Sequence, residues 1–182
     1  MSTFNVPKRE EVNENNQAIF DNLNKALGFV PNIYAAMAHS KTALGDFLQF
    51  SNAKTSLTGK EKEVVDLAVS QVNGCRYCQS AHTAISKMKG ISDEQILELR
   101  QGKASWDSKL NALAVISKEI AETRGQVSES TKEAFYNAGY TKENLVDLTI
   151  AVGVITVTNI FHNLTDVAID FPIAEELEVA SV

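Results

Sequence analysis

Apolar residues recur every three or four positions along nearly the whole chain, and alternating strand patterns are hard to find. The first such stretch covers 11–27 and stops at Gly28, and Pro31 then marks a turn because it restricts the residue before it. The same periodicity predicts further helices over 32–39, 41–54, 58–73, 75–90, 92–101, 105–123, 128–137 and 141–162.

Polar and glycine residues at the ends of these stretches give the helices defined limits. Thr58 is followed three residues later by Glu61, the pairing of a capping box, and Gly74 ends the helix that this box begins. Cys75 opens the next helix, and Ser92 caps the one after it. The sequence therefore predicts an all-α fold.

One segment of the sequence is similar to another segment later in the chain. Residues 65–74 resemble residues 146–155, which lie 81 residues further on, and in that register Cys75 aligns with Thr156 and Cys78 with Asn159. A degenerate second copy of a helical hairpin would explain the likeness, and so would chance similarity between two helices rich in valine and leucine. Both explanations stay open at the level of sequence.

Composition narrows the class of protein. The chain has 182 residues, of which 44% are hydrophobic and 22% charged, so it suits one compact domain with a sizeable core. Nine glycines and three prolines are too few for a loop-rich sandwich or a disordered chain. We therefore expect a single globular domain over 1–182.

Charge and hydropathy argue against nucleic acid or a membrane as partners. The net charge is −6 and no Lys/Arg cluster stands out. The longest apolar run, 145–164, is interrupted by Asp147, Asn159, His162 and Asn163, which disfavours a membrane span. The first residues are polar and do not resemble a secretory signal, so we expect a cytoplasmic protein.

The chain's two cysteines, Cys75 and Cys78, are separated by two residues. In a reducing compartment this spacing favours redox catalysis or metal binding over a structural disulfide. On a helix, Cys78 and His82 project within about 60° of Cys75, so all three share one sector. If the helix begins near Cys75, its free N–H groups favour the thiolate form of both cysteines.

Glu63 lies on the preceding helix, eleven residues before Gly74, whereas His82 lies eight residues after it. An antiparallel helical pair with its turn at Gly74 places the carboxylate roughly level with the imidazole. A Glu–His–Cys proton relay follows from this arrangement. We expect Glu61 and Asp66 to face elsewhere on the helix.

Glu63, Cys75, Cys78 and His82 in this register resemble the signature of the AhpD-like alkylhydroperoxidases, within the carboxymuconolactone decarboxylase superfamily. Tyr77 differs from some members, which carry histidine there, and this leaves the path of the proton open.

Two further segments, 29–32 and 163–172, resemble more particularly the peroxidase-related branch of that superfamily. The resemblance covers most of the chain, whereas its most specific motif spans 63–82.

The resemblance implies a single all-helical AhpD-like domain, with its redox core at about 58–90, that forms homo-oligomers. It implies a thiol-dependent peroxidase that needs no cofactor or metal. Cys78 would be the peroxidatic residue, oxidised to sulfenic acid, and Cys75 would resolve it to a disulfide. Glu63 and His82 would supply the proton relay, and a thioredoxin-like or lipoyl-bearing dithiol would reduce the oxidised pair.

Simpler interpretations stand beside this one. The cysteines are otherwise small buried hydrophobes, or Cys75, Cys78 and His82 bind zinc, although a fourth ligand is not evident. Glu63 is otherwise a solvated surface charge, and His162 a helix-cap or core hydrogen-bonding residue rather than a catalytic one.

Other functions stay open too. One is a non-catalytic redox sensor or oligomeric interaction protein. Another is a carboxymuconolactone decarboxylase, which we disfavour because that chemistry does not need the cysteine pair.

Overall fold

The structure is a computed structural model and describes residues 4–177; the remaining ends of the expected domain, 1–3 and 178–182, lie outside the described residues. A 3₁₀ turn, η1 (Arg9–Glu11), precedes nine α-helices in this range, and the same range contains no strand. The helices are α1 (Glu14–Leu27), α2 (Asn32–Met37), α3 (Ala43–Ser51), α4 (Gly59–Val72), α5 (Arg76–Met88), α6 (Asp93–Arg100), α7 (Ser108–Thr123), α8 (Glu129–Asn137) and α9 (Lys142–Thr165). The all-α prediction is confirmed.

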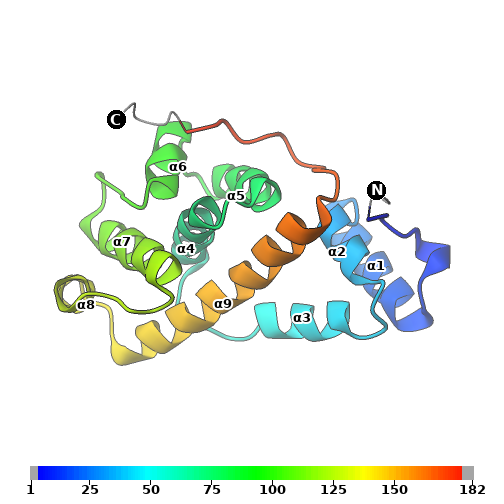
Figure 1. The fold of residues 1–182 in the computed structure, drawn as a ribbon, viewed down its shortest axis with the longest axis horizontal. Coiled ribbons are helices and arrows are strands. Elements are labelled where there is room, and N and C mark those ends of the chain that lie inside the picture. The colour runs from blue at the N-terminus through cyan, green and yellow to red at the C-terminus, as the bar shows by residue number, and fades with distance from the viewer. Residues whose placement is uncertain (1–3, 178–182) are drawn as a thin grey trace.

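Helix α4 is the centre of the larger of two packed groups, with α5, α6, α7 and α9 around it (Figure 1). Val64, Val65, Leu67 and Ala68 are all fully buried, so α4 is covered on nearly every side. A helix that is apolar around its circumference needs such a cover. The site residues on α4 are consequently held by a helix that is packed within the core.

A smaller group is formed by η1 and helices α1 to α3, which lie at one end of the molecule (Figure 1). Phe20, Leu44 and Phe47 are buried within it, and Val154 and Phe161 of α9 pack against it. Because α9 also contacts α4, α5 and α7, this one long helix joins the two groups. It thereby brings residues late in the chain beside the cysteine pair.

The capping signals in the sequence act as predicted. Thr58 Oγ1 accepts the Glu61 N–H at 3.2 Å, and Glu61 Oε2 accepts the Thr58 N–H at 2.8 Å, which completes the capping box of α4. Gly28 and Gly74 adopt positive φ angles of 84° and 66°, where a side chain would be strained. These residues fix where α1 and α4 end.

Several predicted boundaries were wrong; the helix predicted over 41–54, for example, covers only Ala43–Ser51. The helix predicted over 11–27 is divided, because Asn13 caps a new helix after the 3₁₀ turn. Helix α7 begins three residues later than predicted, since the Asp107 carboxylate accepts the N–H groups of Lys109 and Leu110. Helix α9 runs past 162 to Thr165 before Asp166 turns into the left-handed conformation.

The second helical hairpin suggested by the similarity of 146–155 to 65–74 is not formed. Helix α4 ends at Val72 and the chain reverses at Gly74, whereas the aligned position, Ile155, lies inside the continuous helix α9. The second segment has Ile155 at the position of Gly74, and its own glycine, Gly153, lies inside the helix without a left-handed turn. The repeat hypothesis is therefore wrong, and the likeness concerns two single helices.

The segments 29–32 and 163–172, which resemble one family branch, lie side by side in the structure. Asp170 accepts the Asn32 N–H at 2.7 Å through one carboxylate oxygen and the Tyr77 hydroxyl at 2.6 Å through the other. Phe29 and Phe171 pack edge to face, with ring centroids 5.6 Å apart. Asp170 thus ties both segments to α5.

The final described residues form an extended strap across α5 and α6 (Figure 1, red). Arg100 is buried and donates to the Glu175 carbonyl at 2.6 Å and to the Gln79 side chain at 3.2 Å. Arg76 donates to the Ala174 carbonyl at 2.8 Å. Buried guanidinium groups need such acceptors, so the strap contributes to the stability of the helices that carry the thiols.

Among the described helices, α9 is long and apolar enough to cross a membrane by length and composition alone, with a mean hydropathy of 1.7 and one third of that stretch buried. The same test is passed by core helices of soluble proteins. Leu148, Ile155 and Asn159 pack into the core from one side of α9. Its other side presents exposed apolar side chains.

Candidate active site

The thiols lie where α4 turns into α5. Gly74 reverses the chain, and Cys75 becomes the N-cap of α5, its Sγ accepting the Cys78 N–H at 3.2 Å. Both cysteines are free, with exposed fractions of 0% and 3%. The open N–H groups of a helix N-terminus favour negative charge at such a position.

The pKa values of the two thiols are shifted in opposite directions. The hydrogen bond from Cys78, aided by His162 and by the Cys78 N–H, outweighs burial and lowers the pKa of Cys75 to about 5. The same hydrogen bond raises the pKa of Cys78, and burial and the charge on Cys75 raise it further. The surroundings of the pair therefore favour negative charge on Cys75 over Cys78.

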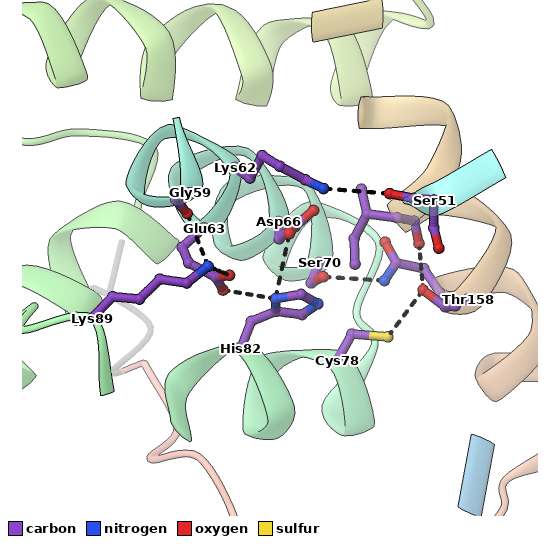
Figure 2. A network of polar contacts seen from close by, with 12 residues as sticks. Ser51, Gly59, Lys62, Glu63, Asp66, Ser70, Cys78, His82, Lys89 and Thr158 are labelled. Atoms are coloured by element: carbon purple, nitrogen blue, oxygen red, sulfur yellow. Dashed lines mark hydrogen bonds and ion pairs between the residues drawn. The ribbon is translucent and has the colours of Figure 1, made fainter. Parts of the chain in front are cut away.

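His82 lies one turn beyond Cys78 and is held by carboxylates from α4 (Figure 2). Its Nδ1 is 2.8 Å from Glu63 Oε2 and 3.4 Å from Asp66 Oδ2. Lys89, just after α5, reaches back and places its Nζ 2.6 Å from Glu63 Oε1 and 2.9 Å from the Gly59 carbonyl. Two acids, an imidazole and an ammonium thus form one chain of contacts.

These contacts decide which groups carry protons. Burial alone would lower the pKa of His82, but Asp66 and Glu63 outweigh it and raise the pKa to about 9. Burial opposes ionisation of Glu63, yet His82 and Lys89 bring its pKa below the ordinary value. Burial raises the pKa of Asp66 to about 6. At neutral pH His82 is therefore an imidazolium, a proton donor.

The structure brings the four predicted site residues together. Glu63 contacts His82 directly, and Cys78 and His82 project from the same side of α5 (Figure 2). The alternative that Glu63 is a solvated surface charge is wrong, because its exposed fraction is 3%. The catalytic roles of Glu63, Cys75, Cys78 and His82 stay a prediction.

Two residues of this network were not predicted from the sequence. Asp66 was expected to face away, and this was wrong: it lies one turn after Glu63, so both carboxylates meet the imidazole. Lys89 was overlooked. The one-turn spacing from Glu63 was the signal for Asp66, whereas nothing local predicts that Lys89 folds back onto α4.

Helix α9 contributes further contacts to the candidate site. Cys78 Sγ is 3.7 Å from Thr158 Oγ1, and Asn159 donates to Ser70 Oγ at 3.1 Å (Figure 2). One turn on, His162 Nε2 is 3.2 Å from the Val167 carbonyl, which confirms the expected core hydrogen bond of this histidine. Sequence spacing gives no hint that 158–162 faces the cysteines.

The Tyr77 position, left open by the sequence, has a structural contact. Its hydroxyl donates to Asp170, and both burial and that carboxylate raise the pKa of Tyr77. A phenol held neutral in this way is anchored rather than free to transfer protons.

One group in the described residues could hold a metal ion: ligand atoms of Glu63, Asp66 and His82 lie within 4.8 Å of one another. This set differs from the zinc alternative, because the cysteines are not part of it. Lys89 already neutralises Glu63 at 2.6 Å, where a metal ion would compete with the ammonium. The carboxylates are thus matched by cations of the chain itself.

Residues 33–118 match the model of the carboxymuconolactone decarboxylase family. No match is found among curated proteins. The matched range contains Glu63, both cysteines and His82.

Solved structures share the fold over nearly the whole chain. The AhpD core, an uncharacterized peroxidase-related protein from Ralstonia eutropha JMP134, superposes with a TM-score of 0.83 at 22% identity, covering 93% of this chain and 92% of that one. A peroxidase-related protein from Silicibacter sp. TM1040 gives 0.79 at 21% identity, with 90% of each chain covered. The debrominase Bmp8 gives 0.78 at 14% identity, with 93% of each chain covered.

A family match that includes the thiol motif and a fold shared end to end point the same way. Residues 33–118 are thus similar to the carboxymuconolactone decarboxylase family, and the chain shares its fold with AhpD-like proteins.

Proposed function

We propose that this protein is a thiol-dependent peroxidase that reduces hydrogen peroxide or organic hydroperoxides. The observation that carries the proposal is the buried pair Cys75 and Cys78 beside a protonated His82. A peroxide needs a sulfur nucleophile and an acid for its leaving oxygen, and this arrangement supplies both.

The first step oxidises Cys78. Its proton passes to the Cys75 thiolate, and the Cys78 sulfur attacks one peroxide oxygen, so an S–O bond forms while the O–O bond breaks. His82 gives its proton to the leaving oxygen, which departs as water or an alcohol. Glu63 and Asp66 stabilise the imidazolium and hold its orientation. The peroxide has gained two electrons and Cys78 is a sulfenic acid.

The second step forms the disulfide. Cys75 sulfur attacks the sulfenic sulfur, the S–S bond forms, and the S–O bond breaks with loss of water. The two residues lie one helical turn apart, a separation that a disulfide spans. A thioredoxin-like or lipoyl-bearing dithiol would then reduce the disulfide and would itself be oxidised to a disulfide.

Peroxide consumption tests the proposal. With dihydrolipoamide as reductant, we expect many equivalents of tert-butyl hydroperoxide to be consumed per chain, and Cys78→Ser to abolish this turnover. His39→Gln, which changes an exposed histidine in the smaller group of helices, is the matched control. Consumption that stops after one equivalent would favour the redox sensor instead.

A debrominase with the same fold gives a second candidate, thiol-driven dehalogenation. A cysteine-to-alanine variant of that protein forms a complex with 2,3,4-tribromopyrrole. Incubation of this protein with 2,3,4-tribromopyrrole and the same dithiol should release no bromide. Bromide release that depends on Cys78 would replace the peroxidase proposal.

We also propose a cytoplasmic homo-oligomer, assembled through α9. Six residues spaced alternately by four and three positions form an uncovered stripe: Val146, Ile150, Gly153, Val157, Ile160 and Leu164. Such spacing is the seam along which helices pack against each other. Light scattering should give at least twice 19.9 kDa, and Ile160→Lys should lower the mass, whereas Met88→Lys, exposed on α5, should not.

A further inference from the structure

The hydroxyl of Thr158, on α9, makes two contacts inside the candidate site. Its Oγ1 donates to the Ile155 carbonyl at 2.9 Å and lies 3.7 Å from Cys78 Sγ, a hydrogen-bond distance for the larger sulfur atom (Figure 2). The exposed fractions of Thr158 and Cys78 are 8% and 3%, so water has little access to either side chain. Thr158 therefore touches the sulfur to which the proposed reaction assigns the attack on peroxide.

The direction of the two hydrogen bonds follows from the number of protons. A carbonyl oxygen can only accept, so the single hydroxyl proton of Thr158 is directed at Ile155. The lone pairs of Oγ1 are left for Cys78, which must then be the donor and hence a protonated thiol. The resting contact thus suits Cys78 only while its sulfur carries a proton.

Loss of the Cys78 proton would leave two acceptors facing each other. The Thr158 hydroxyl can correct this by turning about its C–O bond, which moves one hydrogen and no heavier atom. The Ile155 carbonyl would keep a partner, because it lies inside α9, where a carbonyl accepts the N–H four residues further on. Turning is therefore cheap, whereas a buried thiolate without a donor is costly.

The next residue on α9 fixes the place of this hydroxyl. Asn159 donates to Ser70 Oγ at 3.1 Å and accepts a hydrogen bond from Asn73 at 2.9 Å. Both ends of its amide are engaged, so this part of α9 is fastened to α4 and to the turn that follows it. The Thr158 hydroxyl is consequently held against the Cys78 sulfur.

We propose that Thr158 is a further catalytic residue, whose hydroxyl accepts the Cys78 S–H in the resting site and turns to donate to the sulfur when Cys78 ionises. Its use in catalysis rests on the proposed peroxidase function, in which the Cys78 proton passes to Cys75 as the sulfur attacks. Thr158 keeps its own proton throughout and changes only the atom to which that proton points. The donor is thus supplied as charge develops on the sulfur.

The surroundings of Cys78 are compatible with this role. The hydrogen bond with Cys75 and burial raise the pKa of Cys78, whereas Asn159 and Thr158 act in the opposite direction. The titratable groups packed around the cysteine pair come from α2, α4, α5 and α9 and are Tyr34, Asp66, His82 and His162. They are the same in every variant at position 158, so a comparison of such variants measures the hydroxyl alone.

Titration of Cys78 by ultraviolet thiolate absorbance tests the proposal in a Cys75→Ser background, where Cys78 is the one cysteine of the chain. The replacing hydroxyl keeps the N-cap contact with the Cys78 N–H. We expect Thr158→Val, which keeps the shape and removes the hydroxyl, to raise the Cys78 pKa by about one unit, hence about tenfold less thiolate at a pH below both values. Thr158→Ser should restore the original pKa.

Thr149→Val is the matched control, because Thr149 also lies on α9 and donates to the Leu145 carbonyl at 2.9 Å, but at the surface. It should leave the Cys78 pKa unchanged. An unchanged or lower pKa in Thr158→Val would overturn the proposal, since a hydroxyl that only accepts favours the protonated thiol. A Thr158→Ser protein that titrates like Thr158→Val would overturn it too.

A second measurement needs no change at Thr158 and covers the case in which its variants do not fold. In the Cys75→Ser protein, the nuclear magnetic resonance signal of the Ile155 carbonyl carbon should shift as Cys78 ionises, because the carbonyl then loses the hydroxyl proton. The Leu145 carbonyl, which faces Thr149, should not shift. A constant Ile155 signal would contradict the turning hydroxyl. Neither titration uses peroxide, so loss of the peroxidase proposal and loss of this one are separate outcomes.

Discussion

The two histidines near the cysteine pair, the partly buried His82 and the buried His162, arise in different ways. His82 is part of the motif itself and is surrounded by two carboxylates and an ammonium from the α4–α5 hairpin. His162 comes from a helix some 80 residues later and faces the Val167 carbonyl instead of a carboxylate. The hairpin itself thus holds His82 as a cation, whereas the end of α9 anchors His162 in the core.

This difference shows how the fold keeps two neighbouring thiols chemically distinct. Cys75 and Cys78 share a helix end and a common burial, so their local sequence alone would make them equivalent. The opposite pKa shifts follow from what each thiol meets. The Cys78 side chain, and after it His162 and the Cys78 N–H, lower the pKa of Cys75, whereas the hydrogen bond with Cys75, burial and the Cys75 charge raise the pKa of Cys78. In the proposed peroxidase, two unlike thiols would permit an ordered reaction.

The largest expected effect would come from replacing each of the two cysteines in turn by serine. Cys78→Ser should abolish sulfenic-acid labelling by a dimedone-type probe after peroxide treatment, because the nucleophile is lost. Cys75→Ser should instead let the Cys78 sulfenate accumulate. Mass spectrometry of the wild type should show a disulfide within one chain. Labelling that survives Cys78→Ser and disappears in Cys75→Ser would reverse the roles.

Removal of the His82 acid should have the next largest effect. His82→Ala and Glu63→Gln should slow oxidation of Cys78 by roughly 10²–10⁴-fold, the usual worth of general acid–base assistance. Glu61→Gln is a matched control, since Glu61 is buried on the same helix and paired with Lys109, away from the imidazole. Equal oxidation rates in Glu63→Gln and wild type would remove Glu63 from the mechanism.

How far the sequence predicts this site depends on whether a contact is local. Glu63, Cys75, Cys78 and His82 lie within two consecutive helices, and a capping box and one glycine fix their register, so their juxtaposition was predictable. The thiol contacts made by α9 depend on how a distant helix crosses α5. Periodicity reports that such a helix is half-buried, but not which face meets which neighbour.

The charge on His82 makes stability depend on pH. Its pKa is about 6.5 in an unfolded chain, and in the fold the carboxylates, acting against burial, raise it to about 9. Protonation therefore stabilises the fold fully below about pH 6.5, and this contribution is lost as the pH rises through about 9. Urea midpoints should fall over that window more steeply in the wild type than in His82→Gln. Parallel curves would contradict the raised pKa.

The smallest expected effect concerns Lys89, the outer end of the His82 network. Lys89→Met removes the ammonium from Glu63, a half-exposed contact at 2.6 Å, and should cost about 1 kcal/mol of unfolding free energy. His82 remains beside Glu63, so oxidation of Cys78 should slow by less than about tenfold.

Lys87→Met is the matched control for Lys89→Met, because Lys87 and Asp93 form a contact of the same 2.6 Å length on the surface. Solvent screens that pair, and its loss should leave both stability and oxidation rate unchanged. If Lys89→Met instead slowed oxidation as much as Glu63→Gln does, the ammonium would hold the carboxylate in place. Lys89, at the C-terminal end of α5, would then belong with the histidines to the groups on which the reaction depends.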